Sequence, residues 1–110
     1  MIDWKRVEEL KDEIGPDDFS EVADMFLQEA DETVSALGGG LAEQDVESQL
    51  HFLKGSALNL GLSELAAICQ DGERKAAAGQ AGQVDLSRVV AVYQASRAAF
   101  LSGMAQGSAA

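Results

Sequence analysis

The sequence predicts an all-α protein, an up-and-down antiparallel four-helix bundle with a short additional helix at its N-terminus. Apolar residues recur at spacings of three and four along most of the chain, which is typical of helices with one buried face. The alternating pattern of strands is absent, and glycines separate the helical stretches. The chain has 110 residues, which suits one domain over residues 1–110 and is too short for two.

The helix boundaries follow from glycines, a proline and capping residues. Helices are expected at about 3–14, 17–37, 43–60, 63–78 and 85–103, the last of which Asp85 opens. Pro16 separates the first two helices, because proline is tolerated in the first turn of a helix and not in its interior. A run of glycines at 38–40 ends the second helix, and Gly61 suits a left-handed cap on the third. A flexible turn is expected at 79–82.

Each helix has an apolar stripe that we expect to face the core. The predicted stripe of the first helix is Trp4, Val7, Leu10 and Ile14, and that of the second helix is Phe19, Val22, Ala23, Phe26, Ala30, Val34 and Leu37. The predicted stripe of the fourth helix is Leu65, Ile68, Cys69, Gly72 and Ala76. The predicted stripe of the fifth helix is Leu86, Val89, Val90, Tyr93, Arg97, Phe100 and Met104.

The charge of the chain is strongly negative and unevenly distributed. The formal net charge is −11, of which residues 1–50 contribute −12 and residues 51–110 contribute +1. Nucleic acids and anionic membranes need a positive surface, so neither is an expected partner. The nearly neutral second half is the better location for an anion such as phosphate, while the acidic half also serves as a solubilising surface.

The sequence also favours a cytoplasmic location. It contains one cysteine, Cys69, which excludes an internal disulfide and fits a reducing compartment. The N-terminus is charged from its third residue onward, so it is not expected to act as a signal peptide. No apolar run approaches the roughly 18 residues that a membrane span needs.

The third helix places the single histidine of the chain on its outer face. At about 100° per residue, with His51 at zero, the apolar stripe centres near 220°. Lys54 then lies near 300°, Gly55 near 40° and Leu58 near 340°, so these residues flank His51 or lie beyond it on the same side. The apolar stripe that defines the opposite side consists of Val46, Leu50, Leu53, Ala57 and Leu60.

Taken singly, these outer residues have ordinary explanations, but together they indicate phosphoryl transfer. A neutral imidazole nitrogen can attack a phosphoryl group. Lys54 can balance the charge of that group, and Gly55 removes a side chain that would block an approaching partner. Glycine inside a helix costs about 1 kcal/mol relative to alanine, and no cap or kink requires it here. Leu58 offers a partner helix an apolar surface.

The run from His51 to Gly61 closely resembles the signature of histidine phosphotransfer (HPt) domains, roughly His-x-Leu-Lys-Gly-Ser-x-x-x-Leu-Gly. Leu65 and the pair Cys69-x-x-x-Glu73 also look like the family pattern. The resemblance extends over nearly the whole chain, although only residues 51–73 are diagnostic.

This resemblance implies that His51 takes a phosphoryl group from an aspartate of one receiver domain and passes it to another, in a two-component phosphorelay. It implies that Lys54 supports the phosphate and that Gly55 provides steric clearance. Some members place a Gln or Arg from the following helix near the histidine, and the sequence leaves open whether Gln70 or Arg74 does so here.

The predicted protein is a phosphoryl carrier and not an enzyme, since the chain has no glycine-rich phosphate loop or nucleotide motif. We expect it to bind no cofactor or metal, with a divalent cation supplied by the receiver domain of a response regulator or hybrid kinase. A monomer is the expected state, because one complete bundle buries every stripe. The candidate docking residues on the exposed surface around the histidine are Glu47, Ser48, Phe52 and Leu58.

Two other classes of function remain alternatives. Helical bundles hold di-iron sites, but such sites need Glu-x-x-His pairs on facing helices, and position 48 is a serine. The chain could instead be an adaptor that binds receivers without transfer, although the presence of His51, Lys54 and Gly55 argues against a degenerate domain.

Overall fold

The computed structural model describes residues 2–39 and 42–105 of the chain. Its helices are α1 (Trp4–Ile14), α2 (Pro16–Gly38), α3 (Glu43–Leu60), α4 (Ser63–Ala77), the short 3₁₀ helix η1 (Ala81–Gln83) and α5 (Leu86–Ala105). Within these residues no strand forms, apart from an isolated antiparallel bridge between Ile2 and Leu62. The predicted all-α class is confirmed.

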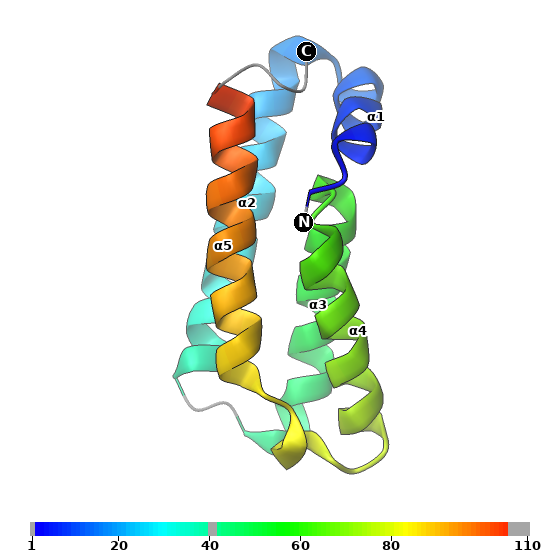
Figure 1. The fold of residues 1–110 in the computed structure, drawn as a ribbon, viewed down its shortest axis with the longest axis vertical. Helices are drawn as coiled ribbons and strands as arrows, with labels where there is room; N and C mark the ends of the chain where they lie inside the picture. Colours follow the sequence, from blue (N-terminus) through cyan, green and yellow to red (C-terminus); the bar gives the residue numbers. More distant parts are fainter. Residues whose placement is uncertain (1, 40–41, 106–110) are drawn as a thin grey trace.

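The four long helices form an antiparallel bundle, and α1 lies beyond the upper ends of α3 and α4, at the height of the upper part of α2 (Figure 1). Helix α3 packs against α2 and α4, and α5 packs against the same two helices, which closes the ring of neighbours. Helix α1 contacts α2 and α3 at the end of the bundle where α2 begins. The molecule measures 43 × 22 × 19 Å along its principal axes, so the bundle is about twice as long as it is wide.

The helix boundaries agree with the sequence to within two residues, with two informative differences. Helix α2 includes Gly38, so the chain leaves the helix one residue into the glycine run; Gly40 lies outside the described residues. The turn expected at 79–82 overlaps the 3₁₀ helix η1, which packs against α3 and α4. Asp85 then caps α5 as expected, because its carboxylate accepts a hydrogen bond from the N–H of Arg88 (3.1 Å).

The core follows the predicted stripes closely in α3 and less closely in α2. The five predicted core residues of α3 are at most 2% exposed. In α2 the prediction was wrong in part: Val22 and Phe26 are only partly buried, and the unassigned Leu27 is 2% exposed. Helix α2 contacts α3 on one side and α5 on the other, so its buried face is wider than a single stripe. The predicted stripe residues that are only partly buried elsewhere are Trp4, Ile14, Ile68, Ala76, Leu86, Val90, Arg97 and Met104.

A polar contact joins α5 to α2 at the edge of this core. Tyr93 donates its hydroxyl hydrogen to the carboxylate of Asp31, and Arg97 donates from Nε to the same oxygen (3.1 Å). Burial, and then the adjacent carboxylate of Asp31, raise the pKa of Tyr93. This explains why Arg97 lies on the inner stripe of α5: its guanidinium reaches a carboxylate on the neighbouring helix.

Gly61 illustrates how the end of α3 is fixed. Its φ of +76° lies in the left-handed region, and a Cβ added there would lie 2.6 Å from the backbone oxygen of Asp3. The N–H of Asp3 donates to the carbonyl oxygen of Gly61 (2.7 Å), and the N–H of Leu62 donates to that of Ala57 (2.8 Å). Gly61 therefore caps α3 and allows the N-terminal segment to approach it closely.

Replacing Gly61 with alanine should destabilise the fold by about 1–3 kcal/mol, because the left-handed backbone and the close contact both oppose a Cβ. Urea unfolding followed by circular dichroism measures this change. The matched control is Gly55→Ala, where a Cβ would meet nothing within 4 Å on a helical backbone. That control should be neutral or stabilising by up to about 1 kcal/mol. Equal stability of the two variants would contradict this account of Gly61.

Candidate functional site

The candidate site lies on the outer face of α3, midway along the bundle. The side chain of His51 is 71% exposed, whereas its neighbours Leu50 and Leu53 are fully buried. The core stripe of α3 faces the bundle interior between α2 and α4, so the opposite side of α3 faces solvent. The structure thus places His51 outward, as the helical wheel predicts, and within reach of another protein.

The carboxylate of Glu73, on α4, contacts both His51 and Lys54 on this face. Glu73 Oε2 lies 3.1 Å from Nδ1 of His51, and Glu73 Oε1 lies 3.0 Å from Nζ of Lys54. The side chain of Glu73 is 15% exposed and that of Lys54 is 21% exposed. The three residues therefore form a connected triad in which each carboxylate oxygen has a different partner.

The contact with Glu73 determines which nitrogen of His51 is available for chemistry. An ionised carboxylate can only accept hydrogen bonds, so Nδ1 is the donor and carries the hydrogen. In the neutral ring the lone pair then resides on Nε2, the nitrogen that Glu73 does not contact. The exposed imidazole consequently presents a nucleophilic nitrogen to solvent.

Close packing of α4 on α3 brings Glu73 to the histidine. Gly72 is buried, and a Cβ added there would lie 2.6 Å from Cδ1 of Leu50. The missing side chain lets the two helices approach at this level. Because Leu50 and Gly72 immediately precede His51 and Glu73, the same close approach aligns the next pair of residues.

Gly55 lies in open space beside the histidine. No atom lies within 4 Å of the position that a Cβ would occupy, so packing in the bundle does not require this glycine. Its carbonyl oxygen accepts a hydrogen bond from Nδ2 of Asn59 (3.0 Å), and Arg6 of α1 donates to Oδ1 of Asn59 (3.4 Å). The space above Gly55 is therefore open, and its role in giving a partner steric clearance stays a prediction.

The four predicted docking residues are all exposed on the same side of α3. Phe52 is 51% exposed and Leu58 is 56% exposed, high values for large apolar side chains. Glu47 and Ser48 line a shallow hollow of about 340 Å³ together with Gln44, His51 and Glu73. The structure thus places Glu47, Ser48 and Phe52 in hollows that His51 also lines, and leaves Leu58 exposed two helical turns further along α3.

Glu73 is the residue that the sequence interpretation missed as part of the site. Gln70 and Arg74, whose roles were left open, are both exposed, and among the described residues Glu73 is the α4 side chain that contacts His51. A signal existed: Glu73 follows Cys69 by one helical turn and adjoins Gly72, so it borders the inner face of α4. Identifying His51 as the partner of Glu73 requires the relative position of α3 and α4, which the apolar pattern of a single helix does not give.

Cys69 has the structural role that its position predicts. It is fully buried, and burial followed by the charge of Glu73 raises the pKa of its thiol to about 12. The thiol therefore remains protonated and packs as a small apolar group.

Residues 2–39 and 42–105 contain no group of three or more His, Cys, Asp or Glu side chains arranged to hold a metal ion. In the same part of the chain, no helix combines the length and the apolar character that a membrane crossing requires.

The site thus combines an exposed histidine on a four-helix bundle with a carboxylate that contacts it, a lysine and a glycine. Comparison with protein families places residues 21–99 in the Hpt domain family, which covers most of the chain and includes the whole triad. The chain therefore belongs to the Hpt domain family, as the sequence resemblance indicates. Comparisons with curated proteins and with solved structures gave no match.

Proposed function

We propose that the chain accepts a phosphoryl group on Nε2 of His51 from the phosphoaspartate of one receiver domain and passes it to a second receiver domain. Membership of the Hpt domain family supports histidine phosphotransfer in two-component phosphorelays as the general activity. The observation that carries the assignment to His51 is its exposed imidazole, with Nδ1 bound to Glu73 and Nε2 directed away from that contact.

The proposed transfer step balances without any further reactant. The lone pair of Nε2 attacks phosphorus, the N–P bond forms, and the P–O bond breaks with its electrons remaining on the aspartate of the receiver. The ring keeps its hydrogen on Nδ1 and gains positive charge, which the carboxylate of Glu73 balances. Reversal of the same step onto another receiver returns the chain to its resting state.

Lys54 is the residue of the chain best placed to neutralise the transferred group. In the resting site its ammonium is bound to Glu73, 3.0 Å away, rather than free as a helical wheel alone would suggest. When His51 is phosphorylated, Glu73 is shared between a charged ring and Lys54, so the ammonium can turn toward the phosphoryl oxygens. The divalent cation of the reaction belongs to the receiver domain.

As a carrier, the chain needs no ATP site of its own, and we propose that it acts as a monomer in the cytoplasm. The protonated, unpaired thiol of Cys69 fits a reducing compartment. The donor and the acceptor are proposed to be receiver domains of hybrid kinases or response regulators.

Incubation with a ³²P-phosphorylated receiver domain tests the proposal. Label should move to the chain, should be lost in acid and retained in base, as expected for phosphohistidine, and should move on to a second receiver. Absence of transfer from every receiver domain of the source organism would exclude a relay function. Stoichiometric iron or zinc in the purified protein would instead favour a metal protein.

Replacing Gly55 with glutamine should slow transfer about tenfold or more while the protein stays folded. The new side chain would extend into the open space beside His51 and would obstruct the receiver, and about 1.4 kcal/mol of lost binding corresponds to tenfold. Helix stability should rise by up to about 1 kcal/mol, since glycine is the poorer helix former. Initial transfer rates and urea unfolding measure both effects, with Gly55→Ala as the smaller control. Unchanged transfer by the glutamine variant would show that steric clearance is not the role of Gly55.

A further inference from the structure

The face formed by α2 and the first half of α3 is acidic, and it contains no basic residue. No lysine or arginine occurs between Lys11 and Lys54. Helix α2 alone contains seven acidic residues. A surface with charges of one sign attracts partners of the opposite sign and repels others over distances of about 10 Å at moderate salt.

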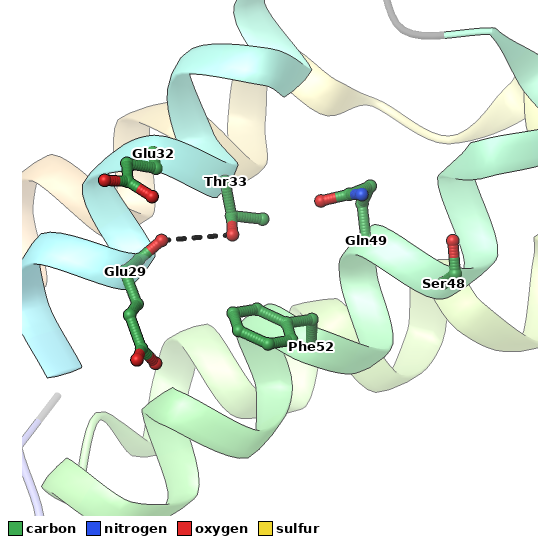
Figure 2. A pocket seen from close by; sticks show the side chains of 6 residues that line it. All are labelled: Glu29, Glu32, Thr33, Ser48, Gln49 and Phe52. Atoms are coloured by element: carbon green, nitrogen blue, oxygen red, sulfur yellow. Dashed lines mark hydrogen bonds between the residues drawn. The ribbon is translucent and has the colours of Figure 1, made fainter.

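A groove on this face lies between α2 and α3 (Figure 2). It has a volume of about 550 Å³ and combines two carboxylates, an aromatic ring and three smaller polar side chains. Gln49 and Phe52 of α3 extend toward α2, while Thr33 donates its hydroxyl hydrogen to the backbone oxygen of Glu29 (3.1 Å). We call this the α2–α3 groove, and its lining residues are Glu29, Glu32, Thr33, Ser48, Gln49 and Phe52.

The α2–α3 groove is continuous with the phosphotransfer site. A neighbouring hollow of about 300 Å³ is lined by His51 and Gly55 and shares Glu29 and Phe52 with the groove. A protein that reaches His51 over Gly55 must therefore also cover Phe52 and approach Glu29. Met25, one helical turn before Glu29 on the same side of α2, is 58% exposed and extends the apolar part of this surface.

The two carboxylates of the groove are not neutralised within the chain. Both are exposed, and no lysine or arginine of the described residues forms a salt bridge with Glu29 or Glu32. Each can therefore pair with a cation of a partner, at the rim of an interface whose centre is the exposed ring of Phe52.

We infer that the α2–α3 groove selects receiver domains whose docking face presents a lysine or arginine beside an apolar patch. This inference rests on the proposed function and names the chemistry of its partner. The apolar patch would cover Phe52, and the cation would enter the groove between Glu29 and Glu32. A second copy of this chain fits poorly, because its own groove face is equally acidic and would be repelled.

The test uses the receiver domain of the source organism that transfers fastest to the wild-type chain. In Glu29→Lys/Glu32→Lys, the specificity constant of transfer from that receiver should fall about tenfold or more. The control Asp12→Lys/Asp24→Lys changes the net charge equally; both residues are exposed, and Asp24 lies about 140° around α2 from Glu29. This control should slow transfer less than about threefold.

A small phosphodonor, phosphoramidate, separates docking from chemistry. It needs no protein interface, so it should label the groove variant and the wild type at equal rates. Exposed lysines and arginines of the receiver, changed singly to glutamate, should include one that slows transfer to the wild type and restores transfer to the groove variant.

The outcomes distinguish the inference from the proposed function. If transfer to the groove variant and to the control variant slowed equally, or did not slow in either, the groove would not be a selective surface. Transfer to His51 would still stand. A groove variant that lost a self-associated dimer in sedimentation would assign the face to a second copy instead. Failure of every receiver and of phosphoramidate to label the wild type would refute the phosphotransfer function itself.

Discussion

Replacement of His51 with glutamine is expected to abolish phosphorylation of the chain. Glutamine offers only a delocalised amide nitrogen, which is not a nucleophile toward phosphorus. The chain has no second histidine to substitute for the first. The imidazole is 71% exposed and its ring contacts Glu73 through Nδ1, so its loss should change the free energy of unfolding by less than about 1 kcal/mol. The loss of function should therefore not come from unfolding.

The measurement compares label on wild-type and His51→Gln chains after incubation with the same phosphorylated receiver domain. Urea unfolding of both proteins provides the control for folding. The receiver should still bind the variant, since Phe52 and Leu58 remain exposed. Retention of acid-labile, base-stable label by His51→Gln would show that the phosphoryl group is carried elsewhere.

The fold is predictable from sequence because each helix has a clear period and a clear end. The five core residues of α3 are the strongest case: they were assigned from spacing alone, and all are buried. The stripe of α2 is the weakest case. Leu27 is 2% exposed although it lies outside the predicted stripe, and α2 contacts both α3 and α5. A periodic pattern does not reveal how many neighbours a helix has.

The outer part of the site was also predictable, since it depends on a single helix. His51, Lys54 and Gly55 lie where 100° per residue places them, and the open space at Gly55 matches the absence of any structural need for glycine. The contacts of Glu73 with His51 and Lys54 were not predictable. They join α3 to α4 and depend on the approach that Gly72 permits against Leu50, a distance that no residue spacing encodes.

Glu73→Gln should slow transfer about 10- to 100-fold, the second largest effect that we expect. Glutamine preserves the size of the side chain but removes its charge and adds an N–H donor. If the amide donates to Nδ1, the ring hydrogen moves to Nε2, and the nitrogen that must attack phosphorus loses its free lone pair. If the amide oxygen instead accepts a hydrogen bond from Nδ1, the glutamine still lacks the negative charge that balances the positive charge of the ring during transfer. Glu73 is thus a positioning residue that acts through His51.

A matched control is Asp71→Asn, on the same helix, where the carboxylate pairs with Lys75 (3.3 Å) and not with His51. Loss of this exposed pair should change the transfer rate by less than about twofold. Nitrogen-15 chemical shifts of the single imidazole, measured with the ring neutral, supply a readout that a purely structural role would not move. Wild type should show the hydrogen on Nδ1, and Glu73→Gln should shift it toward Nε2. Unaltered tautomer and transfer rate in Glu73→Gln would mean that Glu73 only tethers α4 to α3, and that the orientation of His51 arises from packing alone.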